Sequence, residues 1–397
     1  MEVIVIGKPA MNVYLPLQEF PQEGDVFTIT GKNESLGGIT AVSACLLSKW
    51  GVKPHFTGVL GSDGFGEKIR NTFSEYKVNT KFIETNFEKG TATNYFILNV
   101  QSGDVTKILF NDPAVELQKF KYDFQPDWAI MDSSDTAGAM ALLNNDTKVK
   151  TLFYARIADP NTVTLAKRCK TVICTQAFIE RLLKVKITND TSTEDLVSIY
   201  QKLVDEVGSN NYIVILDSRK ILYSEENKVK MLPEMKINHA DISSFDSVFT
   251  GAFAFAKMHD VSLDDSIKLA NTAAAISISK IGEEPAIPTL EEVLTNSGLK
   301  DKLKSYQPQT EEAPQEEQTE APQEQAEVPQ EPVQEAVPSA FDQKPEDVPE
   351  TQAEVQTEAA PVQEAAPVEE APQEEKEEAK VEETPQEPPH EDTNIFG

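Results

Sequence analysis

The sequence predicts an α/β protein whose β-sheet is mostly parallel and is covered by helices on both faces. Residues 3–6 are Val-Ile-Val-Ile and are followed by Gly7, which is typical of a short strand buried on both sides. Further apolar runs of similar length recur along the first three quarters of the chain, and stretches with helical periodicity separate them. Repeated strand–helix units of this kind favour a parallel sheet.

Short extended stretches and two helices are expected in the first part of the chain. The first helix spans about 40–49, since the pair Gly37-Gly38 precedes it and Gly51 stops it, and the second follows residues 61–66 and runs through about Tyr76. A glycine pair at a helix start lets a ligand approach the backbone amides, although loop glycines also serve turns. Residues 101–104, Gln-Ser-Gly-Asp, indicate a hairpin. The expected strands are 12–17, 26–30, 55–60, 91–100 and 105–110.

The second part of the chain continues the alternation of strands and helices. Its last long helix is expected at about 262–281, because Ser262 and Asp265 form a capping box and Gly282 is a stop signal. The expected strands are 128–131, 151–154, 171–174 and 212–216.

The last 94 residues, 304–397, have a different composition from the rest of the 397-residue chain. Residues 306–397 carry 27 Asp and Glu against three Lys, and they hold 14 of the 24 prolines. Such a segment cannot bury enough apolar surface to offset the entropy of ordering it, so a disordered acidic tail rich in Pro, Gln and Glu is predicted. Two roles stay open, a solubilising spacer and an arm that docks a protein through the terminal Asn394-Ile-Phe-Gly397.

Several functional classes are excluded by composition. The acidic charge argues against nucleic-acid binding, and no apolar run is long enough to span a membrane. The N-terminus does not have the pattern of a signal peptide. The three cysteines, Cys45, Cys169 and Cys174, do not have metal-site spacing and are expected to be reduced thiols of a cytoplasmic protein. The scattered histidines form no ligand pair, so no metal site is predicted.

The segment 239–255 is where chemistry is expected. Cap-forming Asp and Ser residues at 241–247 give way to an apolar face at helical spacing, which predicts the start of a helix.

The order of several motifs resembles the PfkB (ribokinase-like) carbohydrate kinase family. The matching landmarks are Gly7, Gly37-Gly38, Gly58-Val-Leu-Gly-Ser-Asp-Gly-Phe-Gly66, Phe249-Thr-Gly-Ala252, Ala270-Asn271 and Gly282. The resemblance implies a doubly wound sheet with a small β lid over a sugar. It places this domain at 1–303, with the lid formed from about 12–32 and 91–110.

The resemblance also implies transfer of the ATP γ-phosphate to a sugar-type hydroxyl, but the catalytic motif departs from the family pattern. Ser247 stands where the family has a catalytic Asp, and Ser244, Phe245 and Asp246 stand where small residues form an anion hole at a helix start. A serine hydroxyl is a poor general base, and a carboxylate at Asp246 would repel phosphate. Alternatively, Asp246 serves as the base after a shift of one residue, or Asp246 and Ser244 only cap the helix.

Other positions implied by the resemblance are Asn12, Gly37 and Gly38 for the sugar, and Ser244, Gly251 and Asn271 for the nucleotide. ATP and Mg²⁺ are the implied cofactors. Gln176 replaces the Asn of a metal-linked motif, and the acid that should follow it is missing at Ile179.

The sequence therefore favours a PfkB-family protein that transfers phosphate weakly or not at all and has a ligand-binding or regulatory role. The alternative is an active ATP-dependent sugar or nucleoside kinase that uses Asp246 as its base. A homodimer formed through the lid is a further hypothesis.

Overall fold

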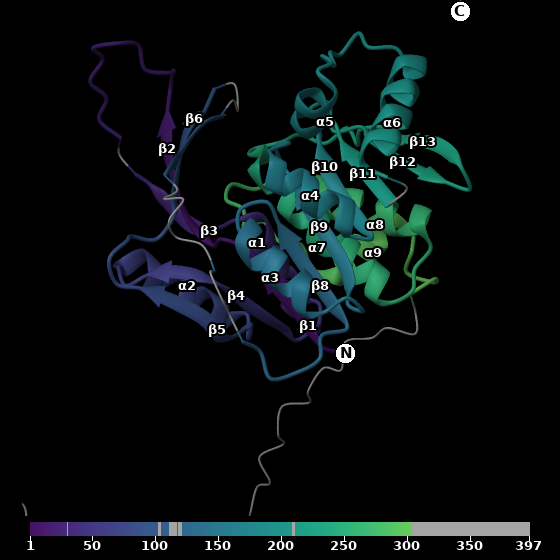
Figure 1. Ribbon diagram of the computed structural model, residues 1–397. Helices are drawn as coiled ribbons and strands as arrows, with labels where there is room; N and C mark the ends of the chain where they lie inside the picture. Colours follow the sequence, from purple (N-terminus) through teal and green to yellow (C-terminus); the bar gives the residue numbers. More distant parts are fainter. Residues whose placement is uncertain (30, 102–104, 111–116, 118–120, 209–210, 304–397) are drawn as a thin grey trace, which may run out of the picture. The chain divides into compact units, whose positions relative to one another are not determined.

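The computed structural model describes residues 1–29, 31–101, 105–110, 117, 121–208 and 211–303 (Figure 1). They form the predicted α/β fold with a mostly parallel sheet. The predicted tail, 304–397, lies outside the described residues, as does the whole of a second unit at Glu317–Gly397.

The main sheet has nine strands, and seven neighbouring strands from β11 to β5 run parallel. In spatial order they are β13 (Lys228–Leu232), β12 (Ile221–Glu225), β11 (Asn211–Ile215), β10 (Thr171–Thr175), β9 (Lys150–Ala155), β8 (Trp128–Asp132), β1 (Val3–Ile6), β4 (Pro54–Gly61) and β5 (Asn79–Asn86). The antiparallel pair β12 and β13 and the edge strand β5 were not expected. β5 lacks a signal because most of its side chains are polar, and all of them are half-exposed or exposed.

Helices cover both faces of this sheet. Val3 and Val5 of β1 point into one core, and Ile4 and Ile6 point into the other, so the strand is buried on both sides as predicted. The first core is built with α1 (Ile39–Lys49), α2 (Gly64–Glu75), α7 (Phe245–Met258), α8 (Leu263–Ser277) and α9 (Leu290–Ser297). The second is built with α3 (Thr136–Asn145), α4 (Pro160–Arg168), α5 (Gln176–Leu183) and α6 (Thr193–Val207).

Four strands form a separate sheet, which we call the lid sheet. Its order is β3 (Asn33–Gly37), β2 (Ala10–Leu17), β6 (Thr93–Asn99) and β7 (Val105–Phe110), and in Figure 1 β2 and β6 stand apart from the main sheet. The strand expected at 26–30 was wrong, since residues 26–29 belong to no strand and Thr30 is outside the described residues. Val26 is 94% exposed, so its apolar side chain has no core to enter.

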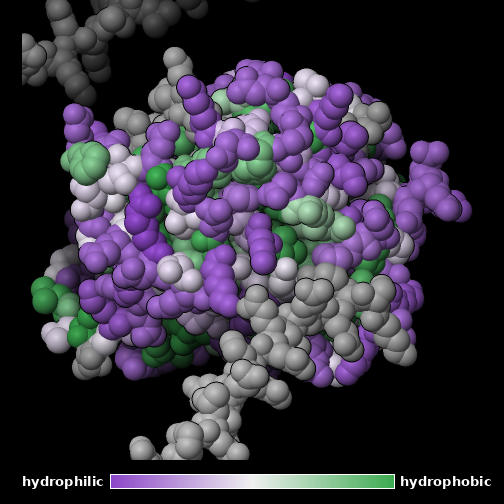
Figure 2. Space-filling model, turned by 90° about the horizontal axis from the view of Figure 1, so that it is seen from below, coloured by the Kyte–Doolittle hydropathy of each residue, from purple (hydrophilic) through white to green (hydrophobic). Residues whose placement is uncertain are grey.

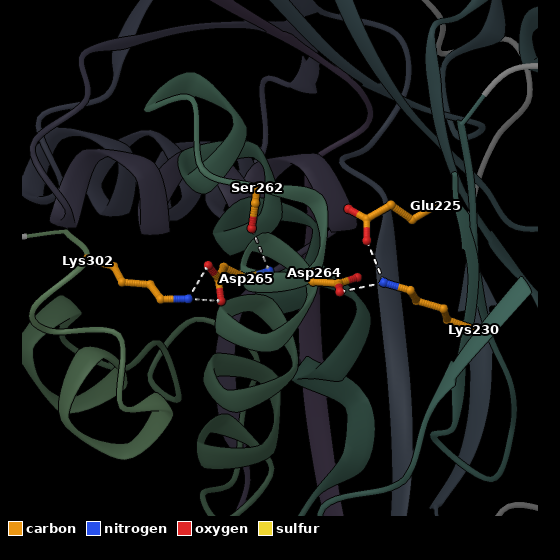
Figure 3. Close-up of polar contacts among 6 residues, drawn as sticks. All are labelled: Glu225, Lys230, Ser262, Asp264, Asp265 and Lys302. Atoms are coloured by element: carbon orange, nitrogen blue, oxygen red, sulfur yellow. Dashed lines mark hydrogen bonds and ion pairs between the residues drawn. The ribbon is translucent and has the colours of Figure 1, made fainter. Parts of the chain in front are cut away.

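The start of α8 matches its sequence signal. The Ser262 side chain accepts a hydrogen bond from the amide of Asp265, and the Asp265 carboxylate pairs with Lys302 (Figure 3). Lys230 joins Glu225 of β12 to Asp264 on the same helix end. Acidic residues are favourable in a first helical turn.

α8 ends earlier than the sequence predicted, since its last residue was expected at about Ile281. The helix stops at Ser277, because the carbonyl of Ile278 accepts hydrogen bonds from the amides of Ala240 and Asp241 instead of continuing the helix. The loop from 240 to 245 is thereby tied to the end of α8.

The surface seen from below is mostly hydrophilic, with hydrophobic residues in small separate patches (Figure 2). No helix in the described part of the chain is both long enough and apolar enough to cross a membrane.

Candidate functional site

A cavity of about 350 Å³ lies at the carboxyl ends of the central strands. β1 lies between β4 and β8, so the chain builds the sheet outward in both directions from this point. In open α/β sheets, ligands bind in the crevice at such a switch point. The cavity is lined by Lys8, Ala10, Gly38, Ile39, Ala92, Asn94, Leu109, Asp132, Ser133, Ser134, Tyr154, Arg156, Ile157 and Asp159.

The lid sheet covers this cavity with one face. Asn12 of β2 lies opposite Ser35 of β3 and Asn94 of β6, and Asn94 lies opposite Leu109 of β7. Residues directly opposite one another on neighbouring strands point to the same face of a sheet. Because Asn94 and Leu109 line the cavity, this row of three polar side chains and one leucine lies on the cavity side of the lid sheet.

Asp63 fixes the lid to the main domain. Its carboxylate caps α2 by accepting from the amide of Gly66 at 2.8 Å, and it accepts from the Thr91 amide at 2.7 Å and hydroxyl at 2.6 Å. Thr91 leads directly into β6. Burial acts to raise the pKa of Asp63, but these hydrogen bonds lower it below its ordinary value.

Two glycines predicted to bind a sugar lie beside the cavity. Gly38, at the cavity wall, has a φ of 101°, and a Cβ there would lie 2.7 Å from the carbonyl oxygen of Lys8. A Cβ on Gly37 would overlap the Asn12 side chain at about 2.2 Å. Close packing of the protein against itself therefore requires both glycines.

Asn12, the third residue predicted to bind a sugar, is buried in a hydrogen-bonded row. Its Nδ2 donates to Glu283 Oε1 at 2.9 Å, and its Oδ1 accepts from Asn94 Nδ2 at 2.8 Å. Glu283 is 6% exposed, and its Oε2 is buried with no partner among the described residues. Burial raises the pKa of Glu283 to about 7; Asp241 and Asp246 add to the rise, and Lys107 and Asn12 oppose it.

The start of α7, where a base and an anion hole were sought, is occupied by internal hydrogen bonds. The hydroxyl of Ser247 is fully buried and donates to the carbonyl of Ser244 at 3.0 Å. The hydroxyl of Ser244 bonds that of Ser277 at 2.8 Å. Neither hydroxyl reaches the cavity walls.

Asp246 is closer to the cavity than Ser247. It is half-buried in the first turn of α7, and its Oδ2 accepts from Tyr154 Oη at 2.5 Å. Tyr154 lines the cavity, so Asp246 lies one hydrogen bond away from it. Burial raises the pKa of Asp246, while Tyr154, Lys107 and Arg156 act to lower it.

The other residues predicted to bind the nucleotide lie inside the domain. A Cβ on Gly251 would lie 3.0 Å from Ser43 Cα, so this glycine allows α7 to approach α1 closely. Asn271 of α8 is 3% exposed. Their contact with a nucleotide stays a prediction.

A second cavity, of about 320 Å³, lies beyond β10 and β11 and is lined in part by Gln176, Asp217 and Lys220. The Gln176 side chain donates to Glu180 and to the carbonyl of Ile187, and it accepts from the amide of Asp217. Burial raises the pKa of Asp217, and the charges of Glu180 and Asp246 add to the rise. In the described part of the chain, no group of three or more acidic, His or Cys side chains could hold a metal ion.

Sequence reasoning missed several residues that the fold brings to the cavity. Tyr154 and Arg156 lie at the carboxyl end of β9, and Asp132 lies at that of β8. Polar residues just after a predicted buried strand were the available signal. Glu283 had a weaker one, since it follows Gly282 directly.

Comparisons with known proteins agree with this architecture. A family model described as pfkB family carbohydrate kinase matches residues 1–290. A ribokinase of Haemophilus influenzae is 23% identical over 301 residues, which cover 73% of this chain and 96% of that protein.

Two solved structures share the fold. A ribokinase from Cryptococcus neoformans in complex with ADP superposes with a TM-score of 0.61 at 18% identity, covering 74% of this chain and 99% of that one. A ribokinase from Arabidopsis thaliana complexed with ribose and ATP gives a TM-score of 0.60 at 18% identity, covering 75% and 98%.

Proposed function

Because this chain belongs to the PfkB family of carbohydrate kinases, we propose that it is a ligand-binding member that transfers phosphate weakly or not at all. The observation that carries this proposal is the start of α7, where Ser244 and Ser247 are committed to hydrogen bonds within the protein.

The hydroxyl of Ser247 is not suited to remove a proton from a substrate. It is fully buried, and it already donates to the Ser244 carbonyl. A positioned general base contributes about 10²- to 10⁴-fold to a rate. Its loss alone would leave little turnover.

The start of α7 and the second cavity, where the family resemblance places the nucleotide, fit ATP and Mg²⁺ poorly. Helix N-termini bind phosphate through free amides and the positive end of the helix dipole, whereas Asp246 brings a carboxylate to the first turn of α7. Asp217 adds an acidic group to the lining of the second cavity, and Glu180 lies behind it, bonded to the lining residue Gln176. We infer that ATP binds weakly.

The lid-covered cavity supports the ligand-binding part of the proposal. Its walls combine amide, hydroxyl and charged side chains, as expected for a polyhydroxylated ligand, and its volume is at the low end for ligand sites. The Arabidopsis structure contains ribose together with ATP. A sugar-type molecule is accordingly the ligand class that we propose.

One observation favours the alternative of an active sugar or nucleoside kinase. Asp246 lies next to the cavity through Tyr154, and its raised pKa is a property of many catalytic bases. In this alternative, Asp246 takes the proton of the sugar hydroxyl that attacks ATP.

A phosphoryl-transfer assay separates the two readings. The wild-type chain is assayed with ATP, Mg²⁺ and a panel of sugars and nucleosides, beside calorimetric titration with each ligand. We expect sugar binding without turnover. Turnover that is lost in Asp246→Asn and kept in Asp205→Asn, an exposed control on α6, would establish the active kinase instead.

Association through the lid and a cytoplasmic location belong to the same proposal. Tyr95, Ile108 and Phe110 lie on the lid face opposite the Asn12 row and are 38%, 54% and 56% exposed, which supports a homodimer formed there. Ile108→Lys should then convert a dimer to a monomer in light scattering. The three cysteines are buried free thiols, as a reducing compartment allows. A protein partner for the tail stays a prediction.

A further inference from the structure

Four charged side chains line the 350 Å³ cavity: Lys8, Asp132, Arg156 and Asp159. Their formal charges cancel. The carboxylate oxygens of the two acids accept hydrogen bonds from the protein, whereas among the described residues no acceptor lies within hydrogen-bond distance of the Arg156 guanidinium.

The carboxylate of Asp132 is saturated. Its Oδ2 accepts from the amide and the hydroxyl of Thr40 at 3.1 and 2.8 Å, and its Oδ1 accepts from the amide and the hydroxyl of Ser134. It is 2% exposed, and burial raises its pKa. It holds the start of α1 against the end of β8.

Asp159 is used as a helix cap. Its Oδ1 accepts from the amides of Asn161 and Thr162, and its Oδ2 accepts from the Thr162 hydroxyl at 2.5 Å. An N-cap carboxylate is favoured by the helix dipole and offers little to a ligand.

The backbone of Arg156 is held by hydrogen bonds, whereas its side chain is exposed. Its amide donates to Ser133 Oγ at 3.2 Å, and its carbonyl accepts from Thr175 Oγ1 at 2.6 Å, which ties it to the neighbouring strands β8 and β10. Within the described part of the chain, no group accepts a hydrogen bond from its guanidinium. The side chain is exposed, and its charge acts on Tyr154 and Asp246 without bonding either.

We propose that this cavity takes a polyhydroxylated ligand that carries an anionic group, a carboxylate or a phosphate, and that Arg156 binds this group. The inference rests on the proposed ligand-binding function and names its substrate class. A planar guanidinium offers paired donors that match a carboxylate or phosphate, and the Arg156 side chain is exposed at the cavity wall. The hydroxyl oxygens of a neutral sugar could accept from Arg156, but they would not balance its charge or match its paired donors.

Matched ligand pairs test this assignment by calorimetric titration of the full chain. D-glucuronate is compared with D-glucose, and D-ribose 5-phosphate with D-ribose, so that carboxylate and phosphate are separated. The variants are Arg156→Gln and Arg156→Lys, and Arg181→Gln is a control that removes an exposed charge outside the cavity lining.

We expect at least one anionic member to bind more tightly than its neutral partner. Arg156→Gln should weaken that binding by about 10- to 100-fold, the usual effect of charged hydrogen bonds, while Arg156→Lys should recover part of it and Arg181→Gln should change nothing. Raising the salt concentration should weaken the anionic ligand only.

Two outcomes would overturn the inference, and they can be told apart. Equal affinity for neutral and anionic partners, or anionic binding that is unchanged in Arg156→Gln, removes the role of Arg156 but leaves a sugar-binding protein. No binding of any of the four ligands by a folded wild-type chain removes the proposed function together with this inference.

Discussion

The lid-covered cavity and the start of α7 are neighbours, joined by the hydrogen bond from Tyr154 to Asp246, yet they use polar side chains in opposite ways. At the start of α7, the hydroxyls of Ser244 and Ser247 form hydrogen bonds within the protein, to Ser277 and to the Ser244 carbonyl. At the cavity, the structure leaves an open volume with an exposed guanidinium at its wall. A polar residue in a motif position is therefore a binding group only if its hydrogen bonds are not already made inside the fold.

The strongest test of this difference is to introduce the same new carboxylate in each region and to compare its effect on stability and turnover. Ser247→Asp restores the residue type of the family base but buries a charge at a fully buried site with no cation paired to it. We expect a loss of about 3–5 kcal/mol in the free energy of unfolding, measured with urea, and no gain in turnover.

Ser133→Asp is the matched control at the cavity. Ser133 is half-buried, and a carboxylate there could still accept from the amide of Arg156. Its cost should be below about 1 kcal/mol. If Ser247→Asp were as stable as Ser133→Asp and gained phosphoryl transfer, the start of α7 would have to be regarded as a working site.

A second prediction concerns the pH dependence of stability set by Glu283, whose carboxylate bonds to Asn12 and is affected by the charge of Asp246. Burial raises the pKa of Glu283 from 4.5 to about 7. Between these values the folded protein keeps a proton that the unfolded chain has released, so stability falls as pH rises through this window. The expected loss is about 3 kcal/mol and is complete above pH 7.

Glu283→Gln should remove this pH dependence, because its amide does not titrate and its oxygen can still accept from Asn12. The difference in unfolding free energy between variant and wild type should therefore grow in favour of the variant from pH 4.5 to 7.5. Parallel curves for the two proteins would mean that Glu283 is solvated or paired in solution.

A third, smaller effect is expected at the link between the regions. Tyr154→Phe removes the hydroxyl that donates to Asp246 Oδ2 and should cost about 2 kcal/mol, since the bond involves a charged group. In a double-mutant cycle with Asp246→Asn, measured by urea unfolding, we expect a coupling energy of about 1–2 kcal/mol. Additive effects would show that the two regions are independent.

The fold was predictable because its signals are local. A few neighbouring residues are enough to predict β1, from its Val-Ile-Val-Ile run, and the start of α8, from the Ser262 cap. The strand expected at 26–30 failed because an apolar residue such as Val26 indicates burial only if a partner surface exists. The end of α8 was also set from a distance, by the amides of Ala240 and Asp241.

The site was less predictable because its hydrogen bonds join residues far apart in the chain. The motif located Asp246, but it did not indicate that Asp246 would meet Tyr154 from β9. Glu283 reaches Asn12 across 271 positions. Spacing within one motif carries no information about such partners.

The smallest effect is expected from removing residues 304–397, which tests whether the two regions depend only on the folded domain. The composition of the tail predicts no packed core, although it holds most of the net charge of −30. A chain ending at Leu303 should keep its unfolding free energy within about 0.5 kcal/mol and its ligand affinities within about twofold. Leu303 itself is 6% exposed and belongs to the core, so Leu303→Ala in the shortened chain should cost about 2 kcal/mol or more. A larger effect from the deletion than from Leu303→Ala would show that the tail contacts the domain, and changed affinity alone would place that contact at the cavity.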